Sequence, residues 1–228
     1  RGAQHRGVVD RASALTLRAM DLNYLLGMAG TVAFAVTAVL AVTPKGIDLF
    51  GASVLAVITA IGGGTVRDLI LGVPVFWASD LNYIWVALVA GALAFYAPRL
   101  VKERRVYVAM LYIDGLGVAL FAIQAAEKVL QLEFAWPLGP ILLGIVTAIG
   151  GGLIRDVLAD SPTLLMKPDL YAIPITIGCI LYVALYNSVD HVALGLGCTL
   201  VIFVIRAAAI RWDLKVPGWL SARSGAAA

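Results

Sequence analysis

A ten-residue segment that occurs twice constrains this chain more than any other feature. Residues 59–68 read TAIGGGTVRD and residues 147–156 read TAIGGGLIRD, with an offset of 88 positions. Each copy lies in a long apolar stretch. Three glycines in a row disfavour a helix, at about 1 kcal/mol each relative to alanine, and a helix broken in hydrocarbon needs partners for its backbone groups. The repeat therefore predicts two matched helix breaks that face a polar path.

Close helix packing is a second interpretation of these glycines, because small residues let two helix backbones approach each other. An Arg-Asp pair follows each glycine triplet at the same spacing. Packing alone requires no such charge pair, so the glycines are interpreted as helix breaks. The predicted break residues are Gly62, Gly63, Gly64, Gly150, Gly151 and Gly152.

The composition is typical of a membrane protein. Of the 228 residues, 61% are hydrophobic and 14% are charged, whereas a soluble domain is nearer half apolar and a quarter charged. A net charge of +3 indicates no nucleic-acid surface. The sequence also lacks the zinc-protease, P-loop and nucleophile-elbow motifs. We expect a protein that is not an enzyme and has no resident cofactor or metal.

Seven apolar stretches, most of them close to the 20 residues that a helix needs to cross a bilayer, predict an all-α membrane protein. The expected spans are Leu22–Val42, Leu49–Leu71, Leu81–Pro98, Val106–Ala126, Phe134–Leu158, Leu170–Val189 and a seventh from about Val192. Helices 2 and 5 carry the glycine triplets and are expected to be broken there.

The repeat extends beyond the glycines, since residues 30–35 resemble residues 117–122 and Pro74 corresponds to Pro162. Spans one to three thus repeat as spans four to six, and an odd number of spans makes the second copy inverted. The predicted boundaries are a leader at 1–20, ahead of a typical start at Met20, one membrane domain at 21–215 and a tail at 216–228. Within the membrane domain, repeat one is 21–98, repeat two is 106–189 and helix seven is 191–211.

Basic residues predict the orientation of the chain. Loops on the N-terminal side carry two Lys or Arg residues outside the leader, and loops on the other side carry eleven. The positive-inside rule then places the C-terminus in the cytoplasm and the N-terminus outside a cell (inner) membrane.

The charge pairs are candidate functional residues. Arg67, Asp68, Arg155 and Asp156 lie within about one turn of the predicted breaks, near the positive end of a helix dipole. Arginine opposes a cation path, so we expect each arginine to pair with a carboxylate and to shape or gate the path. Alternatively, these charges anchor helix ends and point outward at the interface. Thr65 is a further polar candidate.

Asp114 interrupts an otherwise uncharged stretch of the fourth span. The corresponding residue of the first span is Gly27, so the repeat does not require an acid there. A carboxylate at this depth should face the bundle interior or water, where it could pair with Arg67 or Arg155 or line a cation path. The alternative is that the span begins later and that Asp114 lies near the interface.

The repeated segments resemble the prokaryotic trimeric intracellular cation (TRIC) channel family. The resemblance rests on residues 62–72, GGGTVRDLILG, with PVFW at 74–77, and on residues 150–158, GGGLIRDVL. It extends over residues 21–211, nearly all of the predicted membrane portion.

The resemblance implies seven helices, a homotrimer, and one pore for monovalent cations, chiefly potassium, inside each protomer. It implies that the second and fifth helices frame this pore and that Asp114 is the acid of the fourth helix. Membrane lipid and two further copies of the chain are the expected partners. Some bacterial relatives are discussed as glycine transporters, so a secondary transporter of a small solute such as glycine is the alternative. A structural membrane trimer without transport is the third possibility.

Overall fold

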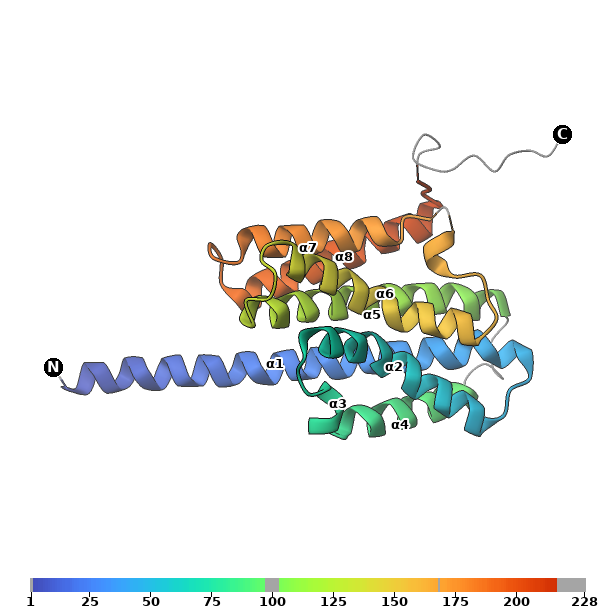
Figure 1. The fold of residues 1–228 in the computed structure, drawn as a ribbon, viewed down its shortest axis with the longest axis horizontal. Coiled ribbons are helices and arrows are strands. Elements are labelled where there is room, and N and C mark those ends of the chain that lie inside the picture. The colour runs from blue at the N-terminus through green and yellow to red at the C-terminus, as the bar shows by residue number, and fades with distance from the viewer. Residues whose placement is uncertain (1, 97–102, 168, 217–228) are drawn as a thin grey trace.

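The computed structural model describes residues 2–96, 103–167 and 169–216 (Figure 1). Within them the regular secondary structure is helical, and the loops contain one isolated bridge between Asp169 and Lys215. The elements are α1 (Gly2–Val42), η1 (Thr43–Lys45), α2 (Leu49–Leu71), α3 (Phe76–Ser79), α4 (Asn82–Tyr96), α5 (Glu103–Gln131), α6 (Leu138–Leu158), η3 (Leu164–Met166), α7 (Ala172–Leu185) and α8 (His191–Trp212).

The helices form an elongated bundle, with α7 and α8 along one side, α3 and α4 along the other, and α1, α2, α5 and α6 between them (Figure 1). Five described helices are long and apolar enough to cross a membrane, while α4 and α7 are apolar but shorter. The chain is therefore a multi-pass helical membrane protein. Its core is mainly apolar, with Phe34, Val39, Val118 and Ile175 almost fully buried.

Several predicted boundaries agree with the structure for clear reasons. The second span matches α2 at both ends, because the Asp48 side chain accepts a hydrogen bond from the Gly51 N–H and Gly72 ends the helix at φ +66°. The fifth span begins later than predicted, at Leu138, because Pro137 is the N-cap of α6.

The predicted leader is not a separate element. α1 begins at Gly2 and continues without a break to Val42. No glycine or proline lies between Gly7 and Gly27, and the intervening Ala, Leu and Arg residues favour a helix. Figure 1 shows the N-terminal part of α1 projecting beyond the bundle. Most of the predicted tail, from residue 217 onward, lies outside the described residues.

Hydrogen bonds between helices fix their relative directions. Asn23, near the start of the apolar part of α1, donates to Glu127, near the end of α5, at 3.2 Å. At the opposite end, Lys45 after α1 donates to the carbonyl oxygen of Asp160 after α6, at 2.8 Å. Along the same pair of helices, Gly30 lies against Phe121 and Gly117 against Phe34, so α1 and α5 are antiparallel.

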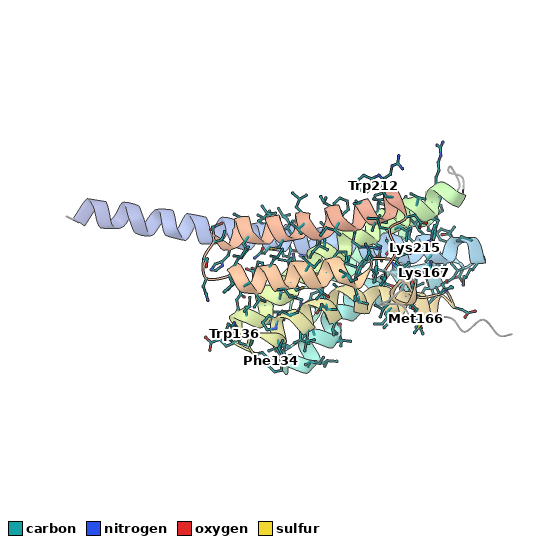
Figure 2. The ribbon with its side chains drawn as sticks, turned by 90° about the horizontal axis from the view of Figure 1, so that it is seen from above. Phe134, Trp136, Met166, Lys167, Trp212 and Lys215 are labelled. Atoms are coloured by element: carbon teal, nitrogen blue, oxygen red, sulfur yellow. The ribbon has the colours of Figure 1, made fainter. Side chains whose placement is uncertain are left out.

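Bulky and basic side chains mark the two ends of the bundle. Figure 2 shows Phe134 and Trp136 at one end, and Met166, Lys167, Trp212 and Lys215 at the other. Trp136 and Trp212 are both about two-thirds exposed, at 67% and 68%. Exposed tryptophans at both ends are typical of the two interfaces of a membrane protein.

Candidate functional site

α2 and α6 cross at the two glycine triplets. A methyl group on Gly63 would collide with the carbonyl oxygen of Thr147, and one on Gly151 would collide with the carbonyl oxygen of Thr59. A Cβ on Gly150 would lie 3.2 Å from the Gly63 Cα. The two backbones therefore touch, as small residues allow. Both helices run through the triplets without interruption, so the predicted breaks are wrong, and close packing explains the glycines.

In the first copy of the repeat, Asp68 is the centre of a buried network. Its Oδ1 accepts hydrogen bonds from Arg67 Nε at 2.8 Å and from Lys128 Nζ at 2.7 Å. Its Oδ2 accepts from the backbone N–H of Phe76 at 2.9 Å. Asp68 is fully buried and Arg67 is only 7% exposed. The expected Arg-Asp pairing is present, and the alternative of outward-pointing anchors is wrong.

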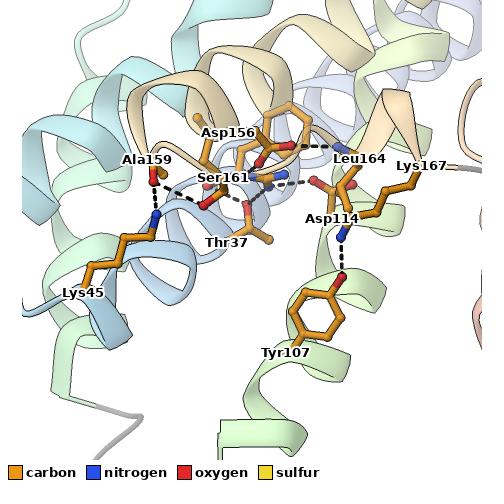
Figure 3. A network of polar contacts seen from close by, with 11 residues as sticks. Thr37, Lys45, Tyr107, Asp114, Asp156, Ala159, Ser161, Leu164 and Lys167 are labelled. Carbon is orange, nitrogen blue, oxygen red and sulfur yellow. Dashed lines mark hydrogen bonds and ion pairs between the residues drawn. The ribbon is translucent and has the colours of Figure 1, made fainter. Parts of the chain in front are cut away.

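The second copy repeats this geometry and adds an acid. Asp156 accepts from Arg155 Nε at 2.8 Å and from the backbone N–H of Leu164 at 3.0 Å. Arg155 Nη1 also donates to Asp114 Oδ1 at 2.7 Å and to Thr37 Oγ1 at 3.0 Å (Figure 3). Asp114 and Arg155 are completely buried. Asp114 therefore pairs with Arg155 in the interior, and its placement near the interface is wrong.

A cavity lies on the Arg67 side of the glycine crossing, between helices of one chain. Its volume is about 370 Å³. It is lined by Asn23 and Tyr24 of α1, Ala60, Gly64 and Arg67 of α2, Phe76 of α3, Tyr83 of α4, Phe121, Gln124, Glu127, Lys128 and Gln131 of α5, and Thr147 of α6. The cavity thus reaches Thr147, at the point where α2 and α6 touch.

The cavity wall carries both signs of charge. The Arg67 guanidinium lies over the Phe76 ring, with Cζ 5.8 Å from the ring centroid. Only its Nε donates to a protein group, Asp68, so its two terminal nitrogens have no hydrogen-bond partner in the part of the chain that the structure describes. Glu127 accepts from Asn23 Nδ2 at 3.2 and 3.3 Å and from Gln131 Nε2 at 3.4 Å. The cavity can therefore contact a cation or an anion.

The sequence-based prediction did not include the α5 part of this cavity. Gln124, Glu127 and Lys128 have the i, i+3 and i+4 spacing that places side chains on one helix face. That spacing at the end of the fourth apolar span was the available signal. By contrast, Thr65 lies apart from the cavity wall: its hydroxyl donates to the Ile61 carbonyl oxygen and accepts from Trp77 Nε1 at 3.0 Å.

No group of three or more metal-ligating side chains occurs among the described residues. Cys179 and Cys198 are both free and buried. The polar cavity and the Asp114–Arg155 cluster are therefore the features of the described fold that offer chemistry.

Comparison with known sequences finds one matching family model and relatives described as UPF0126 membrane proteins. The model of a family described as glycine transporter matches residues 24–99 and 111–187. A UPF0126 membrane protein of Vibrio cholerae is 39% identical over 92% of this chain and 86% of its own length. The UPF0126 inner membrane protein YadS of Escherichia coli K12 is 38% identical over 86% of this chain and 95% of its own.

Solved structures resemble the whole fold. The TRIC trimeric intracellular cation channel orthologue from Rhodobacter sphaeroides has a TM-score of 0.80 and 32% identity, over 85% of this chain and 99% of its own. A prokaryotic TRIC channel in 0.5 M KCl has a TM-score of 0.81 and 25% identity, over 86% of this chain and all of its own. The resemblance to prokaryotic TRIC channels is confirmed. These neighbours are ion channels and not enzymes, as predicted for this chain.

Proposed function

This chain belongs to the family whose model is described as glycine transporter, and from that premise we propose that it forms a homotrimeric channel for monovalent cations, chiefly potassium. The observation that supports a channel most strongly is the match to the R. sphaeroides TRIC channel over 99% of that channel's length. That structure and its prokaryotic relative are described as TRIC channels, and the R. sphaeroides protein as trimeric. The proposed architecture is two inverted three-helix repeats followed by α8.

In the proposed arrangement each protomer holds one pore, and the cavity between α1 and α6 is its candidate path. The helices are not broken, so backbone carbonyls freed by a break are not available as cation ligands. In the proposed pore, the Glu127 carboxylate and the Gln124 side-chain oxygen offer the hard oxygen ligands that replace part of a cation's hydration shell. Arg67 and Arg155, each held by a carboxylate, shape the path on the two sides of the crossing.

Ion selectivity tests this proposal directly. Purified protein in a planar bilayer should give stepwise unitary currents, and in a potassium chloride gradient the current should reverse near the potassium equilibrium potential. The current should reverse there because oxygen ligands hold the cation, while the arginines remain paired with acids. A reversal near the chloride potential would mean that the free nitrogens of Arg67 set the field, and it would contradict cation selectivity.

Orientation is a second prediction. α8 has 22 residues, so it spans about 33 Å and separates Ser188 from Lys215 by a membrane thickness. With the basic end of the bundle in the cytoplasm, a cysteine at Lys215 should react with an impermeant reagent only in inside-out vesicles, and a cysteine at Ser188 only in right-side-out vesicles. The reverse pattern would overturn the orientation, and labelling of both from one side would overturn the spanning role of α8.

A secondary transporter of a small solute such as glycine is the second candidate, and one observation favours it beyond the family description. The cavity is lined both by the Arg67 guanidinium, whose terminal nitrogens have no hydrogen-bond partner among the described residues, and by the Glu127 carboxylate, so it offers a group of opposite sign to each charge of an amino acid. Saturable glycine uptake into proteoliposomes without unitary currents would favour the carrier over the channel.

A further inference from the structure

The two halves of the site share part of their lining and differ elsewhere, since Gln124, Glu127 and Lys128 of the cavity wall correspond to Thr37, Leu40 and Ala41 at an offset of 87. Wall residues of the cavity have counterparts 88 positions later, in the cluster around Arg155. The pairs are Gly64 and Gly152, Arg67 and Arg155, Phe76 and Leu164, and Tyr83 and Tyr171. On the first helix of each repeat the offset is 87, and there the chemistry differs, because Gly27 occupies the position that corresponds to Asp114.

The two halves also differ in the space that they enclose. The cavity around Arg67 has a volume of about 370 Å³. The corresponding cleft, which Gly152, Asp156, Leu164 and Tyr171 help to line, has no room for a water molecule. The first half is therefore open where the second is sealed.

Position 27 faces two residues of the cavity wall. A Cβ on Gly27 would lie 2.9 Å from Tyr83 Oη and 3.3 Å from Gln124 Oε1, and both residues belong to the cavity wall. In the second half the equivalent direction is occupied by the Asp114 carboxylate, which binds Arg155 at 2.7 Å. The absence of a side chain at position 27 thus coincides with the free terminal nitrogens of Arg67.

We propose that the residue at this one repeated position, Gly27 in the first half and Asp114 in the second, decides which side of the pathway is sealed. Asp114 closes its half by holding the Arg155 guanidinium across it. Gly27 supplies no acid, so Arg67 stays free at its terminal nitrogens and its half stays accessible to water and solutes.

The Asp114–Arg155 pair has the properties of a gate. Asp114 Oδ2 and Arg155 Nη2 are both buried and have no hydrogen-bond partner in the described part of the chain. Buried polar atoms without partners are unfavourable, so the closed arrangement leaves hydrogen-bonding capacity that entering water could satisfy.

Cysteine accessibility tests this proposal. Thr147→Cys reports on the deep end of the cavity and Gln131→Cys on its exposed end, while the buried native cysteines provide the background. Adding Gly27→Asp should slow labelling of position 147 by a small water-soluble thiol reagent about tenfold or more, within the range of a single coupling between sites. Labelling of position 131 should not change. The test measures access, so it does not depend on whether the protein is a channel or a carrier.

Two further variants separate charge from volume. Gly27→Asn adds nearly the same volume without the charge, so position 147 should be labelled at close to the parental rate. Combining Gly27→Asp with Arg67→Gln should return the labelling rate of position 147 to the parental value. Equal closure by Asn and Asp, or no closure by Asp, would overturn the proposal. If Gly27→Asp does not give folded protein, Asp114→Asn is the alternative test. It should increase the labelling rate of Thr163→Cys on the sealed side, and an unchanged labelling rate at that position would contradict the proposal.

Discussion

Gly63→Ala is expected to destabilise the folded protein by about 1–3 kcal/mol or more, the range for overpacking a well-packed interior. The added methyl group would meet the carbonyl oxygen of Thr147, which is backbone inside α6 and cannot rotate away as a side chain would. α2 and α6 must then separate at their crossing. Gly151→Ala should have a similar effect, because its methyl group would meet the carbonyl oxygen of Thr59 and the ring of Phe34. Thermal unfolding followed by size-exclusion chromatography in detergent measures both.

Gly197→Ala is the matched control. Gly197 lies within α8, and a Cβ there would meet nothing within 4 Å. Alanine favours a helix by about 1 kcal/mol over glycine, so this variant should be as stable as the parent or more stable. If Gly63→Ala instead keeps the parental melting temperature and changes only the conductance, packing would not be the role of Gly63, and the glycines would act on the path itself.

The membrane spans could be predicted because apolar length and local end signals determine them. α2 shows this clearly, since Asp48 and Gly72 mark its two ends in the sequence as they do in the structure. The breaks could not be predicted correctly, because helix propensity describes an isolated helix. At the crossing, backbone contact between α2 and α6 favours a continuous helix at glycines that would disfavour an isolated helix. This contact joins residues about 88 positions apart, so no local pattern reveals it.

The candidate site was predictable in full only where its contacts are local, while for Asp114 the sequence left Arg67 and Arg155 open as partners and the structure shows Arg155. Arg67 and Asp68 are neighbours in sequence, as are Arg155 and Asp156, so their pairing followed from adjacency. Lys128 contacts Asp68 across 60 positions. Its role depends on the antiparallel packing of α5 against the other helices, which no local pattern reveals. The sequence repeat did not reveal this part of the site, because Lys128 corresponds to Ala41 in the other copy.

Arg155→Ala is expected to cause the largest loss of stability of any single charge removal in the site. Arg155 and Asp114 are fully buried, and the Asp156 side chain is 6% exposed. Removing the guanidinium leaves two carboxylates close together in the interior without a cation between them. Breaking a buried ion pair in this way costs about 3–5 kcal/mol. The yield of folded protein and its thermal unfolding measure the effect.

The repeat provides an internal comparison for this prediction. Arg67→Ala should cost clearly less, because Asp68 keeps the Lys128 ammonium at 2.7 Å and the cavity admits water to the position that the guanidinium leaves. Combining Arg155→Gln with Asp114→Asn should recover part of the stability lost in Arg155→Ala, since one uncompensated charge is removed and two amides of similar size remain. Equal losses for Arg67→Ala and Arg155→Ala would contradict this account, because they would mean that the acid at position 114, which position 27 lacks, makes no difference to how strongly each half depends on its arginine.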